Sequence, residues 1–176
     1  EKMIKYMRNN IGYPGGFGII PMGLAGFDST SKAYNYNPEK SKQLLAQAGY
    51  PNGEGMQEIT LSTTATYLDL CKYIQQQLGL LGIKVKIDVN PPAALREHIA
   101  QGKTQWFRGS WIADYADAEN YLSLFYSKNH CPKGSNYAHF SSKEYDKLYE
   151  KAILETDYEK RIALYKKMND IIIEES

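Results

Sequence analysis

Hydrophobic residues repeat with two different periods in the middle of the chain, which predicts strands that alternate with helices. Apolar and charged residues alternate strictly through residues 83–89, as expected for a strand with one buried face. Two more strands are predicted over 58–63 and 104–111. Apolar residues at helical spacing predict a helix over 66–80, and a Pro-Pro pair opens another over 92–101. Three strands separated by helices predict βαβ units, a small sheet flanked by helices and an α/β fold.

The segments before this central region combine a long loop with a helix. Residues 11–37 are rich in glycine and proline, which predicts a long ordered loop, and loops of this length inside a domain are often functional. Asn37 then stands as an N-cap before Pro38, and Gly49 is a suitable stop for the helix that they begin. One face of this helix is predicted to carry Ser41, Leu44, Leu45 and Ala48.

The last third of the chain is predicted to be helical. One helix is expected over 117–127, and Ser141-Ser142-Lys143-Glu144 has the spacing of a capping box before the next. Asp157 is expected to cap a final helix whose inward residues repeat at helical spacing. These inward residues are Tyr158, Ile162, Tyr165, Met168 and Ile172. Both ends of the chain fall in helix-like runs, which predicts a piece excised from a larger protein.

Composition narrows the classes of function. A chain of 176 residues with 43% hydrophobic residues can form one domain with its own core. The net charge of +1, from 21 basic and 20 acidic residues, argues against a binder of nucleic acid or of a membrane surface. Tyrosine is abundant, with 15 residues against 5 Phe and 2 Trp, and it suits a wet binding surface as well as an ordinary core. No run of residues approaches the length of a transmembrane helix.

The two cysteines do not predict a catalytic or metal site. Cys71 falls on the apolar stripe of a predicted helix and is expected to be a small buried residue. Cys131 lies in a polar loop with His130 beside it and His139 nearby, but neighbours in sequence rarely face each other. A fourth ligand at diagnostic spacing is also missing, so neither a nucleophile nor a zinc site is favoured. Whether the two cysteines pair stays open.

The stretch from Trp106 to Leu122 carries the most informative chemistry. Two acids, Asp114 and Asp117, follow the predicted third strand among aromatic residues and one arginine. Ligands of open α/β sheets bind beyond the carboxyl ends of the strands. An acid at a strand end near Trp and Tyr suits an ammonium group, through charge-assisted hydrogen bonds and cation–π attraction. This role is favoured for Asp114, whereas Asp117 is better placed to cap the following helix.

Four sequence blocks resemble the family 5 extracellular solute-binding proteins, the group that contains the oligopeptide and dipeptide receptors. The run Trp-Ile-Ala-Asp-Tyr-Ala-Asp at 111–117 resembles that family's Trp-x-Ala-Asp-Tyr-x-Asp segment, although Ala116 stands where many relatives carry proline. This departure leaves the class of ligand open. The other blocks, in the order of the family, are residues 36–53, Gly134–Tyr137 with Glu144–Leu148, and Arg161 with Tyr165.

The resemblance implies a transport receptor and not an enzyme. Residues 1–176 would form a single lobe fragment, of the periplasmic-binding-protein type II kind, within a larger two-lobed protein that closes on its ligand by hinge motion. That protein would be the substrate-binding component of an ABC importer, periplasmic or extracytoplasmic and often lipid-anchored. Its expected partners are an oligopeptide or dipeptide ligand and membrane permease subunits, with no nucleic acid, no cofactor and no metal.

The resemblance also assigns roles to individual residues. Asp114 would pair with the α-amino group of a peptide, and Trp111 would line a side-chain pocket. Arg108 would meet the peptide carboxylate, and Tyr115 beside Asp114 favours a peptide over other ligands. Further candidates for the cleft are Ser135, Asn136 and Tyr137.

Two other functions stay open at this point. The first is a receptor of the same fold for a sugar or metal-chelate ligand, since the family includes members of that kind. The second is a hydrolase domain that uses Cys131 or a pair of carboxylates.

Overall fold

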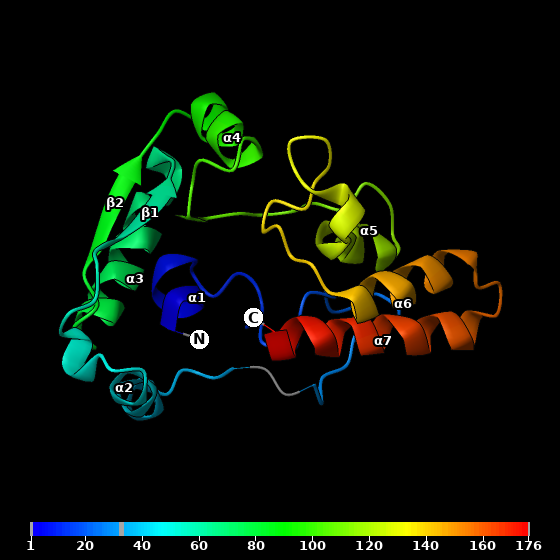
Figure 1. The fold of residues 1–176 in the computed structure, drawn as a ribbon, viewed down its shortest axis with the longest axis horizontal. Coiled ribbons are helices and arrows are strands. Elements are labelled where there is room, and N and C mark those ends of the chain that lie inside the picture. The colour runs from blue at the N-terminus through cyan, green and yellow to red at the C-terminus, as the bar shows by residue number, and fades with distance from the viewer. Residues whose placement is uncertain (1, 32–33, 176) are drawn as a thin grey trace. The chain divides into compact units, whose positions relative to one another are not determined.

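The chain divides into two compact units, each built from separate stretches of sequence (Figure 1). The computed structural model describes residues 2–31 and 34–175, so residues 32–33 of the predicted loop lie outside the described residues. The sheet unit comprises Glu1–Pro14 and Tyr36–Gly109, and the helical unit comprises Gly15–Asn35 and Ser110–Ser176. The prediction that residues 1–176 belong to one lobe of a larger protein is not tested by this division.

The sheet unit contains a three-stranded parallel sheet with the strand order β2-β1-β3. The central strand β1 (Ile59–Thr63) pairs along its whole length with β2 (Val85–Val89) and over two residues with β3 (Trp106–Phe107). Helix α3 (Leu68–Gly79) connects β1 to β2, and α4 (Pro92–Ala100) connects β2 to β3. The expected βαβ units and the α/β class are therefore confirmed.

Strand β3 is much shorter than the strand predicted over 104–111. The backbone amide of Arg108 donates the last ladder bond, 3.1 Å long, to the carbonyl of Ser62. Because β1 itself ends at Thr63, the residues that follow β3 have no strand residues with which to pair. The expectation that Asp114 stands at the end of this strand is therefore wrong, since Arg108 is the residue that follows it.

The core of the sheet unit is small and lies between α3 and the sheet. Leu61, Cys71 and Val85 are buried, and Cys71 confirms the expectation of a buried small residue. The Gln75 side-chain amide donates a 2.7 Å hydrogen bond to the Val85 carbonyl, which ties α3 to β2. Partly buried side chains complete the packing, namely Ile74, Leu78, Ile83, Ile87 and Trp106.

Two further helices of this unit, α1 (Lys2–Met7) and α2 (Pro38–Gln47), contain no buried residue. Asn37 caps α2 as predicted, since its side-chain oxygen accepts a 3.0 Å bond from the Lys40 amide. Leu44, on the predicted apolar face of α2, is exposed.

Backbone segments approach closely where the turn after α2 meets the turn before β2. Gly82 has a φ of +82°, and a Cβ atom there would lie 1.7 Å from the Asn52 carbonyl oxygen. Gly53, at the end of the 3-10 turn Pro51–Gly53, has a φ of +74°, and its Cβ would lie 2.3 Å from the Gly82 carbonyl oxygen. Glycine is therefore required at both positions for conformation and for space.

The helical unit is built on helices α6 (Lys143–Leu154) and α7 (Tyr158–Glu175), which pack side by side (Figure 1). Ser142 caps α6, accepting a bond from the Tyr145 amide at 3.5 Å. Asp157 caps α7 as predicted, accepting a 3.1 Å bond from the Lys160 amide.

The helix expected over 117–127 is broken into three short pieces. These are α5 (Glu119–Leu122) and the 3-10 turns Ser123–Phe125 and Ser127–Asn129.

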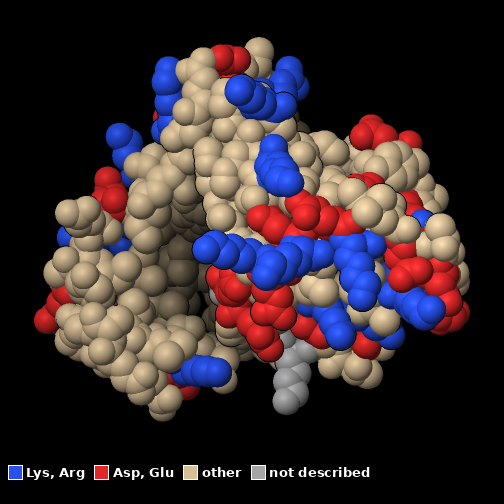
Figure 2. Space-filling model, turned by 45° about the vertical axis from the view of Figure 1, so that its right-hand side comes forward, with Lys and Arg blue, Asp and Glu red and all other residues tan. Residues whose placement is uncertain are grey.

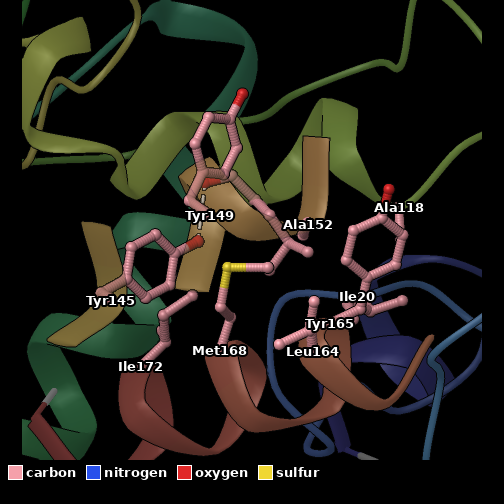
Figure 3. Packing of buried hydrophobic residues seen from close by; sticks show 10 residues of the cluster. Ile20, Ala118, Tyr145, Tyr149, Ala152, Leu164, Tyr165, Met168 and Ile172 are labelled. Atoms are coloured by element: carbon pink, nitrogen blue, oxygen red, sulfur yellow. Dashed lines mark hydrogen bonds between the residues drawn. The ribbon is translucent and has the colours of Figure 1, made fainter. Parts of the chain in front are cut away.

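The core of the helical unit lies between α6, α7, α5 and the long N-terminal loop (Figure 3). Met168 and Tyr145 are fully buried, and the Tyr145 hydroxyl donates a 2.7 Å bond to the Leu122 carbonyl. Of the predicted inward residues of α7, Tyr165, Met168 and Ile172 are buried, whereas Tyr158 is exposed, against the prediction. The other members of the core are Ile20, Ala118, Leu122, Tyr149, Ala152 and Leu164.

A buried asparagine on α7 fastens the long loop to this core. The Asn169 side-chain oxygen accepts a 2.9 Å bond from the Ile19 amide, and its nitrogen donates a 3.0 Å bond to the Phe17 carbonyl. The loop therefore belongs to the helical unit although it precedes the sheet in sequence.

Charged side chains of both signs are mixed on the surface. On the face drawn in Figure 2, lysine and arginine residues lie among acidic ones. Across residues 2–31 and 34–175, no helix combines the length and the apolar character needed to span a bilayer.

Candidate ligand-binding site

The loop that precedes α5 carries three of the predicted ligand-binding residues. Trp111, Asp114 and Tyr115 lie in a segment of the helical unit without helix or strand. The Asp114 side chain is exposed, and within the described part of the chain its carboxylate has neither an ion pair nor a hydrogen bond. The loop thus presents an exposed carboxylate and also carries the side chains of Trp111 and Tyr115.

Asn120 of α5, which the sequence patterns did not single out, supports this loop through hydrogen bonds. Its side chain is 5% exposed, and its oxygen accepts bonds from the Trp111 indole nitrogen at 2.7 Å and from the Asp114 amide at 3.3 Å. The pKa of Tyr115 is raised, mainly by the bond that its hydroxyl donates to Glu119, and a hydrogen bond with the Asn120 side chain opposes that shift. One buried amide therefore bonds both the Trp111 side chain and the Asp114 backbone.

Asp117 has the capping role that its sequence position suggests. Its Oδ1 atom accepts a 2.9 Å bond from the Glu119 amide at the start of α5. Its Oδ2 atom lies 3.5 Å from the Arg161 guanidinium on α7, and its carboxylate also bonds the Tyr165 hydroxyl. Asp117 is therefore occupied inside the protein, unlike Asp114.

Glu119 accepts hydrogen bonds from two tyrosines. The hydroxyls of Tyr115 and Tyr149 both donate to its carboxylate. Burial raises the pKa of Tyr149 above its ordinary value, and the bond to Glu119 adds to that effect. Burial likewise raises the pKa of Tyr165, and the bond to Asp117 adds to it. These tyrosines and acids attach the loop before α5 to helices α6 and α7.

The raised pKa of Tyr149 predicts a loss of stability at high pH. Below about pH 10 the hydroxyl is protonated in the folded and unfolded states, so its contribution is fully present. Above this value the unfolded chain loses the proton first, and the free energy of unfolding falls by about 1.4 kcal/mol per pH unit. We expect Tyr149→Phe to reduce the alkaline slope by that amount in chemical denaturation of the full-length protein. An unchanged slope would contradict the prediction.

Arg108 belongs to the sheet unit and stands where the strand order reverses. Strand β1 leads through α3 to β2 on one side, while β3 pairs on its other side, so the carboxyl ends of β1 and β3 flank a switch point. Ligands of open α/β sheets bind at such points. The Arg108 guanidinium lies 3.6 Å from the centre of the Tyr67 ring, which comes from the 3-10 turn Ala65–Tyr67 after β1. This stacking orients the cation at the carboxyl end of the sheet.

The loop of Ser135, Asn136 and Tyr137 is organised around the middle residue. Asn136 is fully buried and donates to the carbonyls of Tyr126 at 3.1 Å and Phe140 at 3.0 Å. Its side-chain oxygen accepts a 3.1 Å bond from the Phe140 amide. The Asn136 side chain therefore holds the loop together, a role that the sequence did not distinguish from ligand binding. Ser135 is half-buried and Tyr137 is exposed, and both stay predicted ligand contacts.

Cys131 is buried in the same loop and its sulfur lies 3.0 Å from the His139 Nε2 atom. The rings of His130 and His139 have centroids 4.9 Å apart. Among the residues that the structure describes, no group of three or more His, Cys, Asp or Glu side chains is arranged to hold a metal ion. No disulfide bond joins Cys71 and Cys131, and both are buried.

Comparison with known proteins confirms the family that the sequence blocks suggested. Residues 1–132 match the family described as bacterial extracellular solute-binding proteins, family 5 Middle. The glutathione-binding protein GsiB of Escherichia coli K12 is 32% identical over 166 residues, which cover 90% of this chain and 32% of GsiB.

Two solved structures have the same fold and similar sequences. DppA from Helicobacter pylori, in complex with the peptide STSA, is 31% identical with a TM-score of 0.88, over 97% of this chain and 33% of DppA. AgaA from A. tumefaciens R10, in complex with agropinic acid, is 30% identical with a TM-score of 0.81, over 98% of this chain and 35% of AgaA.

The chain thus spans about a third of the length of these relatives. The neighbours confirm the expected fold of the periplasmic-binding-protein type II kind. With the match over residues 1–132, the chain belongs to the bacterial extracellular solute-binding proteins of family 5.

Proposed function

We propose that this chain is part of the substrate-binding component of an ABC importer, and that it binds an oligopeptide or dipeptide without chemical change. Family membership supports the receptor role. The similar protein named for glutathione and the similar structure in complex with the peptide STSA support a peptide-like ligand. The complete receptor would act outside the cytoplasm and would deliver its ligand to membrane permease subunits. The ligand would lie in a cleft between the lobe that contains this chain and a second lobe.

The exposed carboxylate of Asp114 carries the peptide assignment. It is the acid of its loop that has no ion pair in the described part of the protein, whereas Asp117 is paired with Arg161. A peptide ammonium group can form charge-assisted hydrogen bonds with it, and the Trp111 side chain nearby supplies apolar contact. Asp114 therefore holds the ligand amino group.

Arg108 is the proposed site for a ligand carboxylate. Its guanidinium is planar and can donate two parallel hydrogen bonds to a carboxylate. The stack on Tyr67 already restricts the orientation of the guanidinium, so binding costs less conformational entropy. Arg108→Lys would keep the charge and remove both the stack and the paired donors.

The amino-group proposal is tested by calorimetric titration of the full-length protein with the peptide STSA and with N-acetyl-STSA. Hydrogen bonds to charged groups contribute about 1.5–3 kcal/mol, so wild type should prefer the free amine by about 10- to 100-fold. Asp114→Asn should remove most of this preference. Asp170→Asn, a matched charge change at an exposed position of α7, should leave it intact.

Other results would assign another function. An unchanged preference for the free amine in Asp114→Asn would overturn the amino-group proposal. A sugar or metal-chelate receptor would bind neither peptide, and its affinity for its own ligand would depend on Trp111 instead. Mass spectrometry of ligands that co-purify with the full-length protein identifies the chemical class directly, and a processed product would indicate turnover.

A further inference from the structure

We infer that Asn120 is a positioning residue for the ligand-binding loop, because its buried side chain fixes both Trp111 and Asp114. This inference rests on the proposed function and names a residue that acts through the groups proposed to touch the ligand.

A single acceptor atom joins two parts of the loop. The Asn120 oxygen receives the Trp111 indole N–H at 2.7 Å and the Asp114 backbone N–H at 3.3 Å. The first bond sets the direction of the indole ring, and the second sets the backbone from which the Asp114 carboxylate projects. The aromatic surface and the anion are thus held in one fixed relation before a ligand arrives.

Asn120 is itself rigidly supported. It lies between Ala118 and Leu122, both fully buried in the core of the helical unit. Its backbone amide donates a 3.2 Å bond to the carbonyl of Asp117, whose side chain pairs with Arg161 of α7. The core and α7 therefore fix the amide, and the amide fixes the loop.

The loop needs this support because it has little structure of its own. Residues 110–116 contain no helix or strand, and Ile112 and Tyr115 are exposed. Ordering one backbone residue costs about 1–2 kcal/mol, and a loop left mobile would incur that cost during binding. Preorganisation by Asn120 raises affinity without any contact between Asn120 and the ligand.

Asn169 provides a matched control. It is also a nearly fully buried asparagine of the helical unit, and it also fastens a loop through backbone hydrogen bonds. The loop that it holds carries none of the predicted ligand-binding residues. Loss of stability alone would therefore affect both asparagine variants, whereas loss of positioning would affect only Asn120.

The first measurement needs no ligand. The Trp111 indole N–H signal is assigned in the ¹⁵N–¹H spectrum of the full-length protein by comparison with Trp111→Phe. We expect Asn120→Leu, which fills the space without an acceptor, to shift this signal upfield and to speed its exchange with solvent. Asn120→Asp keeps an acceptor oxygen and should retain the signal, as should Asn169→Leu. Asn120→Ala is a second loss variant if leucine prevents folding.

The second measurement is the affinity for STSA and for N-acetyl-STSA. We expect Asn120→Leu to weaken binding of the free-amine peptide about tenfold, which corresponds to about 1.4 kcal/mol. Asn120→Asp should restore the preference for the free amine, and Asn169→Leu should bind as wild type.

Two results would overturn the inference. One is a wild-type indole signal and wild-type affinity in Asn120→Leu, and the other is an equal loss in Asn120→Leu and Asn169→Leu. Failure of the proposed function looks different, because Asp114→Asn would then leave the free-amine preference unchanged. The indole signal would still decide whether Asn120 positions Trp111.

Discussion

Met168→Ala is expected to destabilise the helical unit by about 2–5 kcal/mol, the range for removing a large side chain from a closed core. Met168 is fully buried, and Figure 3 shows its side chain within the cluster formed by α6 and α7. The surrounding side chains come from several elements, so they cannot collapse freely into the space left behind. Labelling of the buried Cys131 thiol measures local opening of this unit in the full-length protein.

The exposed methionine of the same unit is the matched control. Met22 is 58% exposed, and its replacement by alanine should change stability by less than about 0.5 kcal/mol. Labelling of Cys71 reports on the sheet unit and should not accelerate in Met168→Ala. Equal acceleration at both thiols would contradict the assignment of Met168 to one unit alone.

Gly82→Ala is expected to destabilise the sheet unit by about 2–5 kcal/mol. A left-handed backbone costs an alanine about 1–2 kcal/mol, and overpacking adds about 1–3 kcal/mol. The overlap is with a backbone oxygen, that of Asn52, so no side chain can rotate away to relieve it. The expected readout is faster labelling of Cys71, with labelling of Cys131 unchanged.

Gly49 separates the two contributions. Its φ is +89°, close to that of Gly82, but an added Cβ would meet no atom within 4 Å. Gly49→Ala should therefore show only the conformational cost of about 1–2 kcal/mol. If both substitutions destabilise equally, the close approach of the Gly82 turn to Asn52 contributes nothing.

Local signals predicted most of the regular structure. Strict alternation predicted β2, and the caps at Asn37 and Asp157 predicted the starts of α2 and α7. Each of these signals depends on residues only a few positions apart. The length of β3 could not be read locally, since it depends on where β1 ends. The exposure of the apolar face of α2 could not be predicted either, because a sequence pattern shows an apolar face and not what packs against it.

The candidate site was predicted only in part. The motif at 111–117 pointed to Trp111 and Asp114, whose ligand roles stay predictions, and Asp114 is exposed in the structure. The supporting Asn120 was missed because a buried asparagine and a surface asparagine look alike in sequence. The structural role of Asn136 was equally hidden, since its hydrogen-bond partners become visible only in the folded loop. No local signal marks Asn120, because Asp117 and Glu119 precede it and no apolar run surrounds it.

The interleaving of the two units constrains the order in which the chain can fold. The bond between Ile19 and Asn169 joins residues 150 positions apart, so residues 15–31 leave the ribosome long before their partner helix exists. The strands and helices between them form a continuous stretch, Tyr36–Gly109, that can close its own small core during synthesis. Burial of Ile20 must wait for α7, which makes completion of the helical unit a late, long-range event.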